Sequence, residues 1–127
     1  MMFIAFTYPF SYSECTRYFD KVHAKINREF KEEIYFCREL LTQSLEGRNV
    51  ELITITGMNG VSEEEREEEI EGLFKELTEE NDKRRFSAER AHRVKGKKCI
   101  FLSARVHPGE VQSSFVLNGI VDFLLSK

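Results

Sequence analysis

The chain has 127 residues, of which 41% are hydrophobic and 12% aromatic, so it is long enough to bury one core and too apolar to be disordered throughout. A formal net charge of -3 excludes a globally basic nucleic-acid-binding protein. No stretch approaches the roughly 20 apolar residues of a membrane-spanning helix, and the N-terminus shows no basic leader with a cleavage site. The composition therefore predicts a globular protein that binds neither nucleic acid nor a membrane.

The three cysteines, Cys15, Cys37 and Cys99, are odd in number, far apart and each set among apolar residues. This spacing argues against a disulfide framework and against a CxxC metal site. We therefore expect free thiols and a reducing, cytoplasmic environment.

The first predicted elements are a short strand and a helix. Residues 3–6 are apolar and aromatic and lie before Pro9, which predicts an extended strand. Ser11 and Glu14 match the S-x-x-E capping box that opens a helix. The buried face of this helix would hold Cys15, Tyr18, Phe19, Val22 and Ile26.

The next stretch supports two interpretations. Apolar residues recur at helical spacing from Ile26 to Leu45, which favours a continued helix. Residues 46–49, however, read Glu-Gly-Arg-Asn, a good turn, and residues 50–56 are rich in β-branched side chains, which predicts a strand after the turn.

Residues 58–97 are strongly charged. Ser62 and Glu65 match a second capping box and predict an acidic helix. Its apolar side chains would be Ile70, Leu73, Phe74 and Leu77. Eleven acidic residues face two basic ones between residues 63 and 82, whereas eight basic residues face one acidic residue between 83 and 98. We interpret the segment as a solvated insertion whose halves partly neutralise each other, in preference to a specific docking surface.

The last thirty residues carry the chemistry. Residues 99–102 are apolar and predict a strand from Lys98 to Arg105 that is buried on both faces. Pro108 and Gly109 end it in a tight turn, and a core helix would begin near Glu110. The apolar positions of that helix are Phe115, Val116, Gly119, Ile120, Phe123 and Leu124.

His107 and Glu110 would therefore meet across one turn. Zinc binds imidazole nitrogen and carboxylate oxygen, and catalytic zinc sites commonly combine two His and one Glu with an open position for water. A His-x-x-Glu pattern also occurs in ordinary loops, so on its own it is a hypothesis of a metal site. His92 lies among basic residues, which makes it a poor zinc ligand, and we expect His23 to be a packed or half-exposed helix residue.

Three segments resemble the M14 zinc metallocarboxypeptidases, and among these the cytosolic carboxypeptidase branch. They are FIAFTYPFSYSEC (residues 3–15), LLTQSLEGRNVELITITG (40–57) and FLSARVHPGEVQSSFVLNGIVDFLL (101–125), in the family's order. The resemblance implies an α/β fold, with an incomplete carboxypeptidase-like mixed sheet flanked by helices. It also implies that residues 1–127 are the N-terminal portion of a catalytic domain and that residues 35–45 and 49–56 are the strands of a hairpin.

The same resemblance implies zinc, held by His107 and Glu110, and a cytosolic peptidase that removes glutamates from polyglutamylated proteins such as tubulin. The family's second zinc histidine, general base and basic carboxylate clamp have no counterpart between Met1 and Lys127. We therefore expect no turnover by the chain alone, and self-association through an exposed sheet edge. Two alternatives stay open: a truncated, non-catalytic binding or regulatory module, and an incomplete gene model of the first type.

Overall fold

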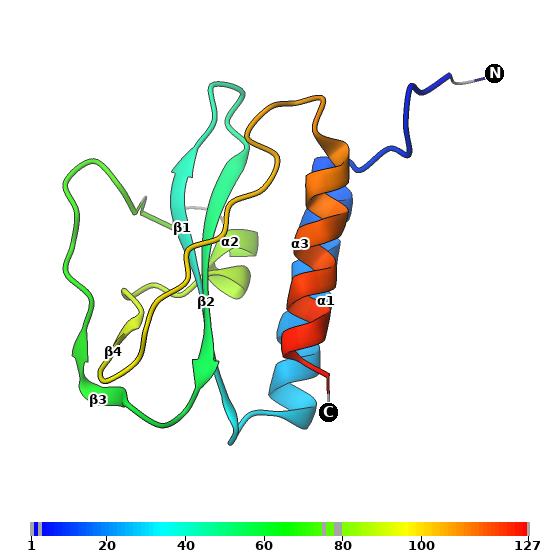
Figure 1. Cartoon of the computed structure of the whole chain (residues 1–127). Helices are drawn as coiled ribbons and strands as arrows, with labels where there is room; N and C mark the ends of the chain where they lie inside the picture. Colours follow the sequence, from blue (N-terminus) through cyan, green and yellow to red (C-terminus); the bar gives the residue numbers. More distant parts are fainter. Residues whose placement is uncertain (1, 3, 75, 78–79, 127) are drawn as a thin grey trace. The chain divides into compact units, whose positions relative to one another are not determined.

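The structure, a computed structural model, describes residues 2, 4–74, 76–77 and 80–126. Its elements, in chain order, are α1 (Tyr12–Glu29), β1 (Ile34–Gln43), β2 (Asn49–Gly57), β3 (Val61–Arg66), α2 (Glu80–Arg85), β4 (His92–Val94) and α3 (Val111–Leu124). Helices and antiparallel strand pairs give a mixed α/β fold, as predicted (Figure 1). The chain divides into a central unit, residues 20–97, and a terminal unit, residues 1–19 with 98–127.

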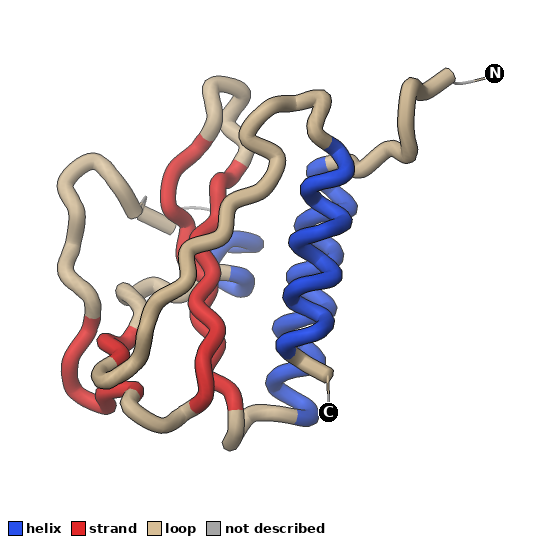
Figure 2. The backbone as a smooth tube through the Cα atoms, in the orientation of Figure 1, coloured by secondary structure: helices blue, strands red, loops and turns tan. Residues whose placement is uncertain are grey.

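The central unit is built on the β1–β2 hairpin. The two strands are antiparallel, with Ile34 opposite Gly57 and Gln43 opposite Asn49 (Figure 2). Gly47 makes the turn with φ +71°, a conformation that glycine adopts without a steric penalty. The hairpin over residues 35–45 and 49–56 is therefore confirmed, and α1 ends at Glu29 instead of continuing along the apolar stripe.

α1 begins as the capping box predicts. The Ser11 backbone N–H donates to Oε2 of Glu14 at 2.6 Å, and the Glu14 N–H donates to Oγ of Ser11 at 3.2 Å. Three of the five residues expected on the apolar face are buried: Phe19, Val22 and Ile26. The capping box and the apolar period together account for this helix.

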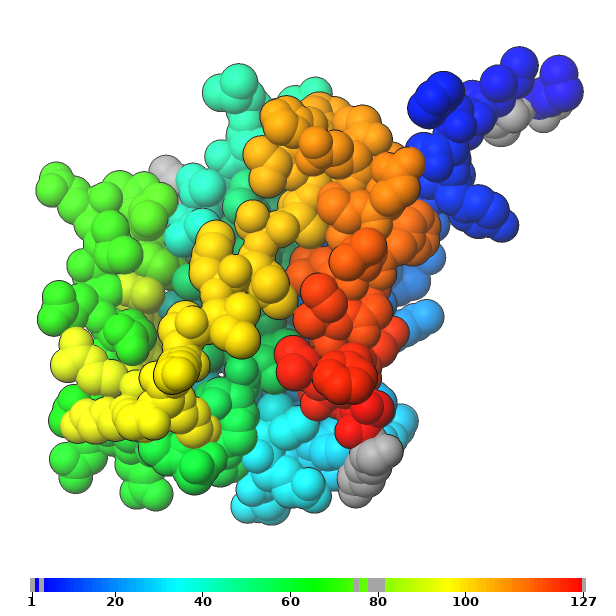
Figure 3. Space-filling view, in the orientation of Figure 1, coloured from blue at the N-terminus to red at the C-terminus, as the bar shows by residue number. Residues whose placement is uncertain are grey.

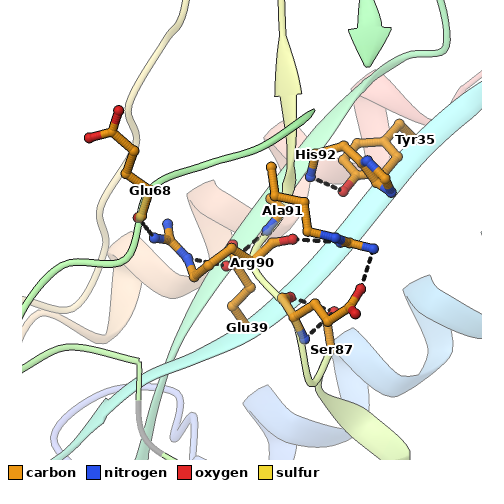
Figure 4. A network of polar contacts seen from close by, with 9 residues as sticks. Tyr35, Glu39, Glu68, Ser87, Arg90, Ala91 and His92 are labelled. Carbon is orange, nitrogen blue, oxygen red and sulfur yellow. Dashed lines mark hydrogen bonds and ion pairs between the residues drawn. The ribbon is translucent and has the colours of Figure 1, made fainter. Parts of the chain in front are cut away.

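Two buried arginines of the central unit pair with carboxylates. Arg38, whose side chain is 1% exposed, donates to Oδ1 of Asp20 at 2.7 Å and to both oxygens of Glu51 at 2.7 and 3.0 Å. The Glu39 side chain, 3% exposed, accepts from Nε of Arg90 at 2.8 Å (Figure 4). Pairing is what makes such burial tolerable, because an isolated charge would lose its hydration without compensation.

The acidic helix predicted from Ser62 is wrong, because Val61–Arg66 forms β3, antiparallel to β4. The physical reason is charge pairing: Nζ of Lys95 lies 2.5 Å from Oε1 of Glu65, and Arg93 lies 3.4 Å from Glu68. Extended pairing lets the acidic half meet the basic half, as the neutralised-insertion interpretation requires. The predicted helix also covered residue 75, which lies outside the described residues.

The terminal unit joins α3 to the start of α1. The Tyr18 hydroxyl donates to the Asn118 carbonyl at 2.8 Å and to Oδ1 of Asp122 at 2.9 Å. The rings of Phe10 and Phe115 meet edge to face, with centroids 5.2 Å apart. The hydrogen bonds of Tyr18 therefore link the beginning of α1 directly to α3.

The strand predicted from Lys98 to Arg105 is wrong. These residues lie outside both described sheets, and Ile100 and Phe101 are 82% and 78% exposed. Figure 3 shows this stretch, coloured yellow, on the surface of the molecule. A strand buried on both faces needs a pairing partner at each edge, and none of the described strands pairs with this segment. The strand predicted over residues 3–6 is also wrong where it is described, since Ile4 and Phe6 are exposed and unpaired in either sheet, and Phe3 lies outside the described residues.

The helix predicted to begin near Glu110 is confirmed as α3, but its predicted core face is wrong. Val111, Ser114 and Val121 are buried. Four of the apolar residues expected in the core are exposed instead: Phe115, Val116, Phe123 and Leu124. The helical spacing of the apolar residues predicted the helix correctly. Which of its side chains are buried depends on the segments that pack against it.

Two further findings concern the cysteines and the helices. Cys15, Cys37 and Cys99 form no disulfide bond with one another. Among the described residues, no helix is both long enough and apolar enough to pass through a bilayer.

Candidate metal centre

The candidate site is the loop that leads into α3. Glu110 occupies the N-cap of α3 with φ -85° and ψ 52°, and its side chain makes no capping hydrogen bond. The Glu110 backbone N–H donates to the His107 carbonyl at 3.1 Å, which closes the loop over Pro108 and Gly109. The carboxylate of Glu110 therefore accepts no hydrogen bond from the backbone N–H groups at the start of α3.

The side chains of His107 and Glu110 converge. Nδ1 of His107 lies 2.9 Å from Oε1 of Glu110, and the side chains are 73% and 53% exposed. Because a carboxylate oxygen only accepts, Nδ1 carries the hydrogen of this contact when Glu110 is ionised. The two groups meet across one turn, as the sequence predicts, while their role as metal ligands stays a prediction.

The donor pair fits zinc in chemistry and nearly in spacing. Nitrogen and oxygen ligands at about 2.1 Å from one tetrahedral zinc ion lie roughly 3.4 Å apart. A shared ion would therefore require Nδ1 of His107 to give up its hydrogen and to lie about half an ångström farther from Oε1 of Glu110 than in their present contact. Both side chains are exposed, so such a movement displaces only solvent. No group of three or more His, Cys, Asp or Glu side chains suited to a metal occurs in the part of the chain that the structure describes.

Two polar residues outside the motif hold the loop. The Arg105 backbone N–H donates to Oγ of Ser113 at 2.8 Å, and the Ser113 hydroxyl donates to the Glu110 carbonyl at 2.6 Å. Nε of Arg105 donates to the Pro108 carbonyl at 2.8 Å, and Nη1 donates to the Phe10 carbonyl at 3.0 Å. These bonds tie the loop to α3 and to the N-terminal segment.

The sequence pattern assigned no role at the site to Arg105 or to Ser113. Bonds from a side chain to a loop backbone leave no periodic signal in the sequence. Arg105 also adopts φ +61°, a left-handed conformation that residue type alone would not predict for arginine. Only the spacing of Ser113, three residues after Glu110, is typical of neighbours on the first turn of a helix.

The other two histidines belong to the central unit and have contacts there. The His23 ring packs on Phe36 with centroids 5.1 Å apart. Burial, and then the nearby charge of Arg38, lower the pKa of His23 from its ordinary value of 6.5, while Asp20 opposes this. The His92 ring lies edge to face with Tyr35, whose hydroxyl accepts from the His92 N–H at 2.8 Å.

No protein-family model matches the chain. The curated proteins that are similar to this chain over nearly its whole length are cytosolic carboxypeptidases. Cytosolic carboxypeptidase-like protein 5 of Mus musculus is 41% identical over 129 residues, which cover 97% of this chain and 13% of the relative. The corresponding protein of Danio rerio is 40% identical over 133 residues, covering 98% of this chain and 14% of the relative.

Cytosolic carboxypeptidase 6 of Mus musculus is 34% identical over 123 residues, covering 97% of this chain and 16% of the relative. The chain thus spans 13% to 16% of the length of these three curated relatives. The similarity extends through the His-Pro-Gly-Glu loop, since it covers almost all of this chain.

Proposed function

We propose that the chain forms the N-terminal portion of the catalytic domain of a cytosolic zinc carboxypeptidase, in which His107 and Glu110 supply two of the metal ligands. The observation that carries the proposal is the 2.9 Å approach of Nδ1 of His107 to Oε1 of Glu110 on an exposed loop. The homology to cytosolic carboxypeptidases supports the class of the enzyme.

Zinc bound in such a peptidase polarises the scissile carbonyl and lowers the pKa of a coordinated water. His107 would contribute a neutral imidazole nitrogen, and Glu110 a carboxylate whose negative charge favours a cation. Their exposure leaves room for a further ligand and for substrate. The second histidine, the general base and the carboxylate clamp would come from other residues of the full-length protein, so we expect weak zinc binding and no peptidase turnover by these 127 residues alone.

We further propose glutamylated protein tails, such as those of tubulin, as the substrate class, and the cytoplasm as the compartment. The names of the relatives support a carboxypeptidase and a cytosolic location. The substrate class rests on the resemblance of the three sequence segments. A tail rich in carboxylates would need cationic groups to bind it.

The test is zinc affinity, measured by competition with a chromogenic zinc indicator. We compare the parent with His107→Ala, Glu110→Gln and the control His23→Gln, which removes an imidazole from the central unit. Saturable binding by the parent and by His23→Gln, with loss of that binding in both loop variants, is the expected result. Equal zinc affinity in the parent and in His107→Ala, with both folded by circular dichroism, would show that the metal assignment is wrong.

A further inference from the structure

We propose that Arg105 and Ser113 are positioning residues that fix the separation and orientation of His107 and Glu110 before any metal binds. This inference deepens the proposed function and rests on it, because it concerns the same two ligands. It assigns a task to contacts that neither the motif nor the homology singles out.

Ser113 joins both ends of the loop to α3. Its hydroxyl accepts from the Arg105 N–H at 2.8 Å and donates to the Glu110 carbonyl at 2.6 Å. The Ser113 backbone N–H also donates to the Glu110 carbonyl, at 3.1 Å. The entry to the loop and the N-cap of α3 are therefore held by one side chain, and moving either end breaks a bond to that side chain.

The side chain of Arg105 holds the middle of the loop. Nε donates to the carbonyl of Pro108, which lies between the two candidate ligands, and Nη1 donates to the carbonyl of Phe10. The ring of Phe10 in turn packs against Phe115 of α3. A planar guanidinium can direct two donors at two carbonyls in fixed geometry, whereas the ammonium of lysine has no such fork.

The backbone of Arg105 shows the same constraint. Its φ of +61° lies in a region that non-glycine residues rarely occupy, and such a conformation persists where surrounding contacts determine it. Here the contacts are the N–H bond to Ser113 and the two guanidinium bonds. The left-handed residue stands two positions before His107, so it sets the direction in which the chain enters the motif.

The positioning role predicts a specific pattern of defects. Arg105→Asn removes the guanidinium but keeps a residue that tolerates left-handed backbone, and Ser113→Ala removes the bridging hydroxyl. Each should lower zinc affinity about tenfold, as loss of a group that orients a ligand commonly does. Each should also change the imidazole ¹⁵N shifts of His107 in the metal-free protein, because its contact with Glu110 loosens.

Matched controls separate positioning from general stability. Ser126→Ala removes a hydroxyl that donates to the Phe123 carbonyl at 2.7 Å at the other end of α3. Arg17→Gln removes one exposed positive charge from α1 within the same unit. Both should retain parental zinc affinity and parental His107 ring shifts. Ser113→Thr, which keeps the hydroxyl, should retain the parental zinc affinity and the parental His107 ring shifts. Arg105→Lys should retain neither fully.

The outcomes distinguish this inference from the proposed function. If Arg105→Asn and Ser113→Ala keep parental zinc affinity and parental His107 shifts, the positioning role is wrong and the ligand assignment stands. If His107→Ala binds zinc as the parent does, the ligand assignment is wrong, while the metal-free shifts still decide whether Arg105 and Ser113 orient the ring. Should Arg105→Asn fail to fold, the Ser113→Ala and Ser113→Thr pair decides alone.

Discussion

His23 is a half-buried imidazole of α1 that packs on Phe36 of β1 in the central unit. Burial, and secondarily the charge of Arg38, lower its pKa in the folded chain from the ordinary value of 6.5. The folded state therefore favours neutral His23 more strongly than the unfolded state does. The resulting stability is fully present above pH about 6.5 and is lost as the pH falls through the lower folded pKa.

We therefore expect the urea midpoint of the parent to fall more than that of His23→Gln between about pH 7.5 and about pH 5.5, because glutamine does not titrate in this window. Most carboxylates stay ionised over this range, and both proteins contain the other two histidines, so the difference between the two curves reports His23. Denaturation curves at several pH values test this. If the urea midpoints of the two proteins fell equally with pH, His23 would not contribute to the pH dependence of stability.

The Arg90–Glu39 pair gives a second prediction for single residues. Among the described residues, Arg90→Met would leave the buried Glu39 carboxylate with only the Ala91 N–H, which donates to it at 3.1 Å. The free energy of unfolding should fall by about 3–5 kcal/mol, the cost typical of an uncompensated buried charge. Arg93→Met is the matched control: its exposed ion pairs with Glu65 and Glu68 should contribute less than about 1 kcal/mol.

Adding Glu39→Leu to Arg90→Met should recover part of this loss, because the double variant no longer buries a charge. Urea denaturation of the parent, the single variants and the double variant measures these differences. Equal destabilisation by Arg90→Met and Arg93→Met would show that the buried pair carries no special cost.

Two glycines test how backbone conformation shapes the elements. Gly47 turns the β1–β2 hairpin with φ +71°, and a Cβ there would meet nothing within 4 Å, so any penalty is conformational. Gly47→Ala should destabilise by about 1 kcal/mol. Gly119 lies inside α3, where a Cβ is also unobstructed, and Gly119→Ala should stabilise by about 0.5–1 kcal/mol. Thermal denaturation compares the two, and shifts of the same sign would contradict the argument.

The two capping boxes show how much of an element its sequence determines. Ser11 and Glu14 begin α1, because the residues that follow bury an apolar face. Ser62 and Glu65 have the same spacing, and the Glu65 N–H does donate to Oγ of Ser62 at 3.0 Å, yet the chain there is extended. Like charges three and four residues apart oppose a helix, and the cations that relieve them lie about thirty residues away, near Lys95.

The candidate site also has one part that the sequence predicted and one part that it did not. The meeting of His107 with Glu110 was predictable, because four residues and one turn decide it. The hydrogen bonds of Arg105 and Ser113 were not predictable. They depend on a left-handed backbone and on carbonyls whose positions follow from the folded loop. The apolar run 99–102 was predicted to be buried, but a hydrophobic run does not identify the residues that would cover it.

At the scale of the whole molecule, the terminal unit exposes many large apolar side chains to water. The exposed side chains of its C-terminal part are Ile100, Phe101, Leu102, Phe115, Val116, Phe123 and Leu124. The curated relatives are about six to eight times as long as this chain, so their additional residues can cover the equivalent surface. In the chain by itself this surface faces water, at a cost of roughly 25 cal/mol per Å² of apolar area left unburied.

We therefore expect the isolated chain to self-associate, with a sedimentation coefficient that rises with concentration. Replacing Phe101 and Phe123 together by serine should shift the population towards monomer, because each removes a large exposed apolar group from the terminal unit. Leu45→Ser is the control, since Leu45 is even more exposed than Phe101 and Phe123 but belongs to the hairpin turn of the central unit. A parent that sediments as a monomer at every concentration and melts cooperatively would show that the terminal unit needs no partner to cover it, whether another copy or the rest of a catalytic domain.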